Sequence, residues 1–142
     1  MKERVFLDTN VLVYLFDADD PAKQRRVQDL LSNRELRARL ILSTQVLQEF
    51  YVSVTRKLAT PLDPEAAFQA VQDLAAFPVV QIDPPLILLA IQRSRKAKVS
   101  FWDALILEAA LAAGATLLYS EDFQDGTVFG GLRIANPFKL SV

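Results

Sequence analysis

Four acidic side chains of the sequence stand where folding could bring them together to do chemistry. They are Asp8, Glu49, Asp103 and Asp122. Asp8 directly follows a short apolar run, and Asp122 comes just after another one. If these runs are parallel strands, their carboxyl ends meet at one edge of a sheet, which is the edge where such sheets bind ligands. The spacing therefore predicts an acidic site at that edge.

The residue types that the chain lacks exclude several kinds of catalytic and metal site. The chain contains no Cys, which excludes a thiol nucleophile, a disulfide and a thiolate metal site. It contains no His, which excludes Ser-His-Asp catalysis and zinc sites of the HExxH type. With 16 Lys and Arg against 17 Asp and Glu, the net charge of −1 argues against a strongly basic coat for nucleic acid. An enzyme of this composition has to work with carboxylates, hydroxyls, amides, Lys and Arg.

Carboxylates that crowd into a partly dry cleft repel one another and need a counter-charge. Mg²⁺ or Mn²⁺ meets this need, because these ions prefer oxygen ligands, keep several waters and require neither His nor Cys. Such a site activates water and holds the oxygens of a phosphodiester during in-line displacement. The residue types alone therefore favour metal-assisted hydrolysis of a phosphate ester.

Apolar runs and helix-start signals alternate along the chain. Strands are predicted at residues 5–7, 40–42, 79–82 and 116–119, with an edge strand at 132–134 after a polar loop at 120–131. Helices are predicted to begin at Asp20-Pro21, Ser43 or Thr44, Asp63-Pro64, Asp83-Pro84 and Ser100. The second of these is expected to reach Leu58 and the last to end at Gly114. Strands that alternate with helices form a parallel sheet with helices on both faces. We therefore predict one α/β domain over residues 1–142 with a central, mostly parallel sheet.

Each acid also has an ordinary structural interpretation. Asp103 forms a Ser-x-x-Asp pattern with Ser100, which is a variant of the helix capping box. Glu49 lies on the flank of its helix's apolar arc, where solvated side chains are common. Asp122 can be a turn acid, and Asp8 can cap the short helical turn that follows it. These four interpretations are less convincing when taken together, because four unrelated acids would have to lie at one edge of the sheet by coincidence.

Four short motifs occur in the order found in one known family. They are LDTN at residues 7–10, QEF at 48–50, SFWDALI at 100–106 and SEDF at 120–123, followed by NPF at 136–138. In this order and spacing the chain resembles PIN-domain ribonucleases, and as a small single domain it is similar to the VapC toxins of VapBC toxin–antitoxin modules. The resemblance runs from the first strand to the end of the chain. It implies a single PIN-like domain that acts as an Mg²⁺- or Mn²⁺-dependent endoribonuclease.

The resemblance implies roles for the four acids. Asp8 and Asp103 are the expected principal metal ligands. Glu49 and Asp122 are expected to complete the catalytic acidic pocket and to share in holding the metal. The fourth motif is the looser match to the family, so Asp122 is the least firmly assigned of the four.

Further residues are expected to support this pocket. Thr9 and Asn10 would orient Asp8 by hydrogen bonds. Ser120 matches the hydroxyl that the family places before its last acid. Asp125 is a second candidate acid in the same loop.

Helical spacing adds one residue that the motifs do not contain. Glu49, Ser53 and Arg56 fall on one face of a helix, which predicts Arg56 beside the acids and in contact with an RNA phosphate; a solvated Arg is the alternative. Phe101 and Trp102 flank the third motif. We expect them to pack in the core, with stacking on an RNA base as the alternative.

The expected partners are an RNA substrate, a cognate VapB-like antitoxin and a second copy of the chain. The resemblance implies that a C-terminal segment of the antitoxin occupies the acidic groove, with Arg side chains toward the carboxylates. The apolar share of 51% in one small domain favours leftover apolar surface, and hence a homodimer. The basic run at residues 93–98 either follows an RNA backbone or is a solvated helix end.

The chain is expected to be cytoplasmic with no membrane association, because its first apolar run is too short for an export signal and no run is long enough to span a bilayer. Two other functions stay open. One is a PIN-like binding module without catalysis. The other is an aspartate-nucleophile phosphatase, which also places an Asp after its first strand. Such phosphatases usually carry a second acid two residues later, where this chain has Asn10.

Overall fold

The middle of the sheet is formed by β1 (Arg4–Leu7), in which every residue after Arg4 is buried. It pairs in parallel with β2 (Leu40–Ser43) on one side and with β4 (Ala115–Tyr119) on the other. These three strands are apolar because both of their faces are covered, as is usual for parallel strands. The first strand of the chain therefore lies in the sheet between two strands that come much later in the sequence.

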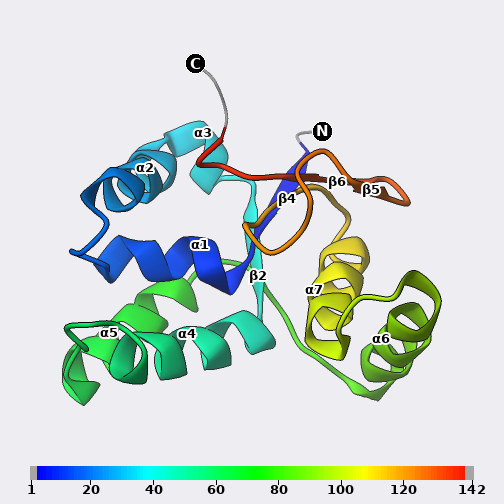
Figure 1. Cartoon of the computed structure of the whole chain (residues 1–142), viewed down its shortest axis with the longest axis horizontal. Helices are drawn as coiled ribbons and strands as arrows, with labels where there is room; N and C mark the ends of the chain where they lie inside the picture. The colour runs from blue at the N-terminus through cyan, green and yellow to red at the C-terminus, as the bar shows by residue number, and fades with distance from the viewer. Residues whose placement is uncertain (1–2, 140–142) are drawn as a thin grey trace.

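Three shorter strands complete the sheet. β3 (Val79–Val80) pairs in parallel with β2, and β6 (Leu132–Ala135) pairs in parallel with β4. β5 (Val128–Phe129) is antiparallel to β6. The computed structural model describes residues 3–139, and within them the strand order is β3-β2-β1-β4-β6-β5 (Figure 1). The expected domain bounds, residues 1 and 142, lie outside the described residues.

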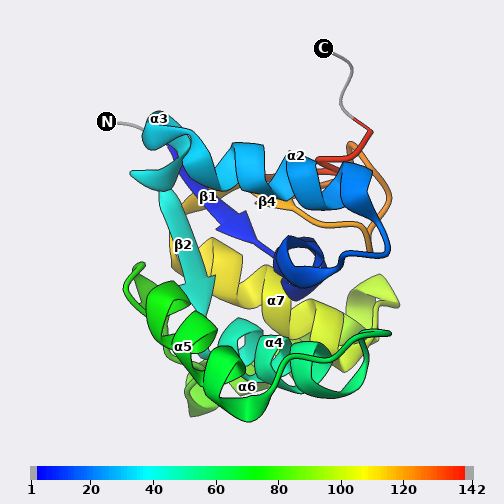
Figure 2. The ribbon, with the colours of Figure 1, turned by 90° about the vertical axis from the view of Figure 1, so that its left-hand side faces the viewer.

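Helices cover both faces of this sheet. In the first half of the chain they are α1 (Thr9–Val13), the 3₁₀ turn η1 (Tyr14–Phe16), α2 (Pro21–Ser32), α3 (Arg34–Arg37) and α4 (Thr44–Arg56). In the second half they are α5 (Pro64–Leu74), α6 (Pro84–Ala97) and α7 (Phe101–Ala112). In Figure 1, α1, α2 and α5 lie to one side of the strands, and α6 and α7 lie to the other. Figure 2 shows the same layers from the side, with α2 in front of β1 and α7 behind it.

The starts of the five long helices agree with the sequence-based prediction. At each start, the side chain of the capping residue accepts a hydrogen bond from the backbone N–H three residues later. The caps are Asp20, Ser43, Asp63, Asp83 and Ser100. α7 is followed by Gly114 with a φ of +75°, the left-handed conformation expected at a helix end. The predicted α/β class with a mostly parallel sheet is confirmed.

The predictions near the end of the chain need correction. Residues 132–134 do not form an edge strand, because β6 is hydrogen-bonded on both sides, to β4 and to β5. β5 lies inside the segment that we expected to be only a loop. It can turn back onto β6 because Gly130, with a φ of +59°, allows a tight connection. Two smaller differences are that α4 ends at Arg56 rather than Leu58, and that β3 is half as long as predicted.

No helix within residues 3–139 is both long and apolar enough to cross a lipid bilayer.

Candidate active site

Asp8 lies at the carboxyl end of β1 and is only 3% exposed. Its backbone N–H donates to the Tyr119 carbonyl at the end of β4, at 3.0 Å. Its carboxylate accepts three hydrogen bonds, from the Thr9 N–H at 2.7 Å, the Ser120 hydroxyl at 2.7 Å and the Asn10 amide at 3.3 Å. The first of these also caps α1. The ordinary capping interpretation of Asp8 is therefore correct, but it accounts for only one of the three bonds.

Ser120 and Asn10 connect Asp8 to the loop after β4. The buried Ser120 Oγ donates to Asp8 and accepts from the Asp122 backbone N–H at 3.0 Å. The Asn10 Oδ1 accepts from the Glu121 backbone N–H at 3.1 Å. The position of the Asp122 backbone relative to Asp8 is thus set by one shared hydroxyl.

Glu49 lies in the second turn of α4, and a donor binds each of its oxygens. The Thr9 hydroxyl donates to Oε1 at 2.8 Å, and the Gln45 Nε2 donates to Oε2 at 3.2 Å. The same Nε2 donates to the Trp102 backbone carbonyl at 3.1 Å. Both of these partners can only accept, so the nitrogen of the Gln45 amide has to face them. Gln45 therefore connects Glu49 to the first turn of α7, which carries Asp103.

The role of Gln45 is absent from the sequence analysis. The side chain is 4% exposed, and its Oε1 is buried without a hydrogen-bond partner among the described residues. Gln45 precedes Glu49 by one helical turn, which is a visible signal. Its second partner is a backbone carbonyl 57 residues away, and no pattern in the sequence indicates that contact.

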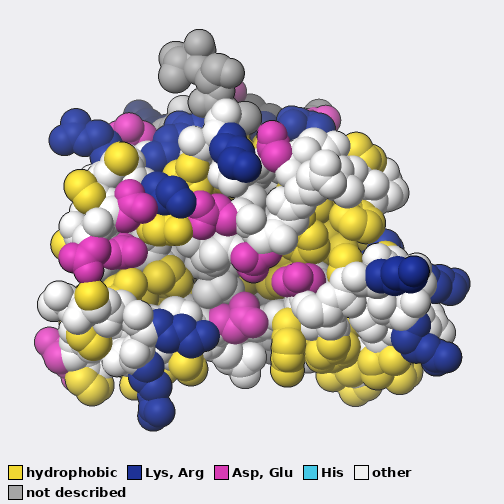
Figure 3. Space-filling model, viewed as in Figure 1, with side chains coloured by type: hydrophobic (Ala, Val, Ile, Leu, Met, Phe, Trp, Pro, Cys, Tyr) yellow, Lys and Arg dark blue, Asp and Glu magenta, His cyan; other side chains and the backbone are white. Residues whose placement is uncertain are grey.

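Asp103 and Asp122 complete the group of four. Asp103 is part-buried in the first turn of α7, where its backbone N–H donates to the Ser100 hydroxyl at 3.0 Å. Asp122 is exposed in the loop after β4. Figure 3 shows acidic side chains grouped near the middle of the face on which α1 and α4 approach α7. The charges of Asp122 and Glu49 act on the carboxyls of both Asp8 and Asp103, so acids from four separate segments lie near one another.

Burial and mutual repulsion raise the pKa values of two of these carboxyls. Burial raises the pKa of Asp8 to about 7, and the charges of Asp122 and Glu49 add to the rise against the hydrogen bonds from Ser120 and Thr9. Burial also raises the pKa of Asp103, and the charges of Asp122 and Glu49 again contribute. Each of these two buried or part-buried acids is therefore costly to ionise without a counter-charge.

The donor chemistry of the site fits a hard divalent cation. All four side chains offer carboxylate oxygens, and the buried Asp8 needs a positive charge to be stable as an anion. Within residues 3–139, no three acidic side chains are close enough together to enclose an ion by themselves. Mg²⁺ commonly binds proteins through one or two carboxylates and retains several waters, so this partly open arrangement suits it.

The remaining predicted residues lie at the margin of this group. Arg56 is the exposed last residue of α4, about 10 Å along the helix axis from Glu49. Asp125 accepts a hydrogen bond from the Asn136 backbone N–H at 2.8 Å, which holds the loop against the end of β6. Its carboxylate is thus engaged with the backbone after β6.

A second cluster, around Glu121, was not predicted. Glu121 accepts a hydrogen bond from the Tyr14 hydroxyl at 2.8 Å and forms an ion pair with Lys23. The Lys23 ammonium also lies over the rings of Tyr14 and Phe138, at 4.8 and 5.1 Å from their centroids. The cluster ties the loop that carries Asp122 to η1 and α2. Its members come from distant parts of the chain, so spacing could not reveal it.

The prediction that Trp102 packs in the core is wrong. Its side chain is 61% exposed, whereas Phe101 is part-buried against Ala90, Ala104 and Leu105. Trp102 is the second residue of α7, and the face of the helix that enters the core begins only at Ala104. The ring of Trp102 therefore stands at the surface beside Asp103.

Comparison with known proteins identifies the family. Residues 5–124 match the PIN domain family, so the chain belongs to that family. No curated protein sequence matches the chain.

Solved structures show the same fold. FitAB bound to an IR36 DNA fragment is 21% identical, with a TM-score of 0.73, over 97% of this chain and 98% of that one. DNA-bound VapBC from Salmonella typhimurium is 19% identical, with a TM-score of 0.66, over 96% and 99%. VapC20 of Mycobacterium tuberculosis, described as a toxin that cleaves the sarcin–ricin loop, is 20% identical, with a TM-score of 0.63, over 83% and 89%. At these identities the likeness concerns the fold.

We predict that Asp103→Asn stabilises the metal-free protein at pH 8. Because the pKa of Asp103 is raised above 3.8 in the folded state, its ionised form opposes folding above the folded-state pKa, and this effect disappears as the pH falls below 3.8. We expect a gain of up to about 1 kcal/mol, limited by solvent screening. Urea unfolding in EDTA between pH 8 and pH 4 measures the gain and its decline.

The exposed Asp19→Asn variant is the control and should change stability little at either pH. A clear loss of stability in Asp103→Asn at pH 8 would show that its carboxylate acts mainly as a helix cap.

Proposed function

We propose that the chain is a metal-dependent endoribonuclease that hydrolyses phosphodiester bonds in RNA, and that it acts in the cytoplasm as the toxin of a type II toxin–antitoxin system. The observation that carries this proposal is that, within a PIN domain, the charges of Glu49 and Asp122 act on the carboxyls of both Asp8 and Asp103. Asp8, at the buried end of the central strand, is the centre of this group. The resemblance of the four motifs to those of VapC toxins supports the choice of RNA.

In this proposal Asp8 and Asp103 are the principal ligands of Mg²⁺ or Mn²⁺, and Glu49 and Asp122 complete the pocket. A bound ion of this kind polarises a phosphate oxygen and lowers the pKa of a coordinated water. Residues of the chain itself orient the carboxylates that would hold this ion. The donors from Thr9, Ser120 and Asn10 hold the Asp8 carboxylate in one orientation, and Gln45 does the same for Glu49.

The chain lacks the second acid that an aspartate-nucleophile phosphatase usually carries two residues after its nucleophile. The position two residues later is Asn10, whose amide donates to Asp8 and cannot act as an acid. Release of phosphate from small monoesters without RNA cleavage would favour the phosphatase.

We predict RNA cleavage that requires Mg²⁺ or Mn²⁺ and stops with EDTA. Asp8→Asn and Asp103→Asn should each lower the rate by at least about 100-fold, because each removes a charged ligand from the site. Gel analysis of a labelled RNA measures the cleavage. The variant Asp125→Asn, outside the group of four, should retain most of the activity. Cleavage that persists in EDTA, with both variants fully active, would refute this function.

An antitoxin partner is proposed from the surface beside the acids. An apolar hollow of about 420 Å³ lies on α4 and α5, and α4 also carries Glu49. Its lining residues are Leu47, Gln48, Tyr51, Val52, Phe68 and Val71. A small VapB-like protein could place apolar side chains in this hollow and an Arg at the carboxylates.

We predict that Phe68→Glu weakens antitoxin binding by at least about 10-fold, because it puts a charge into a contact that should be apolar. Expression of the chain alone should slow growth, and co-expression with an adjacent small gene should restore it. In the Phe68→Glu variant, RNA cleavage should persist while this rescue is lost. Harmless expression of the active enzyme, with no binder encoded nearby, would leave an orphan nuclease.

A homodimer is proposed from the outer face of α6. This face exposes large apolar side chains, which commonly mark an interface. They are Ile87, Leu88 and Ile91. Two-fold dimers are the commonest assembly of soluble proteins.

We predict a solution mass of about twice the 15.9 kDa of the chain in light scattering. Leu88→Glu should shift this mass to the monomer, because it buries a charge in the proposed contact. A monomeric wild-type protein with full ribonuclease activity would show that pairing is neither present nor needed.

A further inference from the structure

Trp102 occupies an unusual place for a large apolar side chain. It directly precedes Asp103, one of the four acids, and the residue is 61% exposed. An indole left in water forgoes the free energy that its burial would release. Neither the ligand set nor the hollow on α4 and α5 makes use of this ring.

The backbone that presents the ring is held firmly. The Trp102 carbonyl accepts the hydrogen bond from the buried Gln45 at 3.1 Å, and Ser100 caps the helix two residues earlier. Phe101 contacts the Trp102 ring edge-on, with centroids 5.0 Å apart and planes at 72°. Trp102 nevertheless stays more than half exposed.

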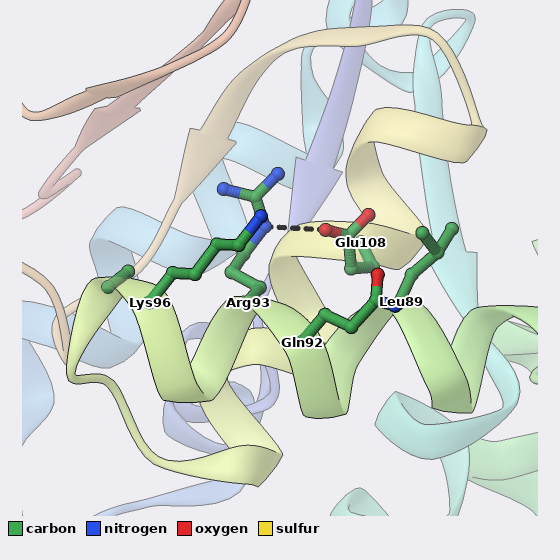
Figure 4. A pocket seen from close by; sticks show the side chains of 6 residues that line it. Leu89, Gln92, Arg93, Lys96 and Glu108 are labelled. Atoms are coloured by element: carbon green, nitrogen blue, oxygen red, sulfur yellow. Dashed lines mark hydrogen bonds and ion pairs between the residues drawn. The ribbon is translucent and has the colours of Figure 1, made fainter.

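Basic side chains end α6 just before this position. Lys98 is the C-cap of α6 in the left-handed conformation, with a φ of 56°, and it lies four residues before Trp102, hence within about 14 Å. Arg95, Lys96 and Lys98 are exposed and form no ion pair among the described residues. By contrast, Arg93 pairs with the buried Glu108 across a pocket between α6 and α7 (Figure 4).

These neighbours combine the elements that single-stranded nucleic acids use. Cations follow the phosphates, and an open aromatic face stacks on a base. Here an exposed aromatic residue follows the basic end of α6 in the chain and directly precedes Asp103. A double helix keeps its bases stacked inside and would offer none to Trp102.

We propose that Trp102 is a stacking platform for an unpaired base of the RNA, next to the bond to be cleaved. This inference rests on the proposed ribonuclease function and adds to it a preference for single-stranded substrate. Stacking on the ring adds affinity and fixes the position of the RNA strand at the site, while the acids serve the hydrolysis.

The test uses the fact that Trp102 is the only tryptophan of the chain, so the intrinsic fluorescence reports on this ring alone. A short single-stranded RNA is titrated into the cleavage-impaired Asp8→Asn variant with Mg²⁺ and into the wild type in EDTA. We expect saturable quenching of the fluorescence. An RNA of the same length with abasic sites, and a blunt RNA duplex, should quench much less.

Substitution separates stacking from a structural role. Trp102→Ala should raise the KM for single-stranded RNA by about 5-fold to 100-fold, the range expected for loss of one base–aromatic stack. The kcat should change little, and Trp102→Phe should restore most of the loss. Val128→Ala is the matched control, because Val128 on β5 is a similarly exposed large apolar residue that belongs neither to the acidic site nor to the proposed partner surfaces.

The outcomes distinguish this inference from the function on which it rests. Cleavage by the wild type with no quenching and an unchanged KM in Trp102→Ala would overturn the stacking platform alone. Saturable, base-dependent quenching without any cleavage would support the platform and overturn the ribonuclease. A change from dimer to monomer in Trp102→Ala would place the ring between two copies of the chain and overturn the platform.

Discussion

The site depends on the burial of one carboxylate at the end of the central strand. Removing the Asp8 side chain from water is costly, and the cost is offset only when donors or a positive charge surround it. Three donors from α1 and from the loop after β4 provide part of this compensation. The same bonds fix the start of α1 and the course of that loop. The same hydrogen bonds therefore determine both the stability of this part of the fold and the geometry of the candidate site.

The groups that donate hydrogen bonds to Asp8 and Glu49 are all neutral. Glu49 is held by a hydroxyl and an amide, and Asp8 by a hydroxyl, an amide and a backbone N–H. Two cations near this region are engaged elsewhere, Lys23 with Glu121 and Arg93 with Glu108. The four acids consequently keep a negative potential that the protein itself does not neutralise. A surface of this kind attracts metal ions and the cationic side chains of a partner.

Much of the fold could be predicted because its signals are local. A cap such as Asp63 with the following Pro64 specifies a helix start within four residues, and all five such starts are found. The features that were missed depend on distant contacts. The place of β6 depends on its pairing with β4, and the exposure of Trp102 depends on which face of α7 meets the sheet. The hydrogen bond from Gln45 to the Trp102 carbonyl also depends on a distant contact. No sequence pattern marks which backbone carbonyl will accept it.

The sheet order has a consequence for when the site can exist. Asp8 is among the first residues to be made, but the hydroxyl that orients it belongs to Ser120, 112 residues later. β1 also lacks one of its two neighbours until β4 has been made. The acids therefore cannot assemble on a chain that is still short of β4, and long-range pairing of this type forms slowly. During synthesis the candidate site therefore stays incomplete until the last quarter of the sequence has been made, although its first acid lies among the first eight residues.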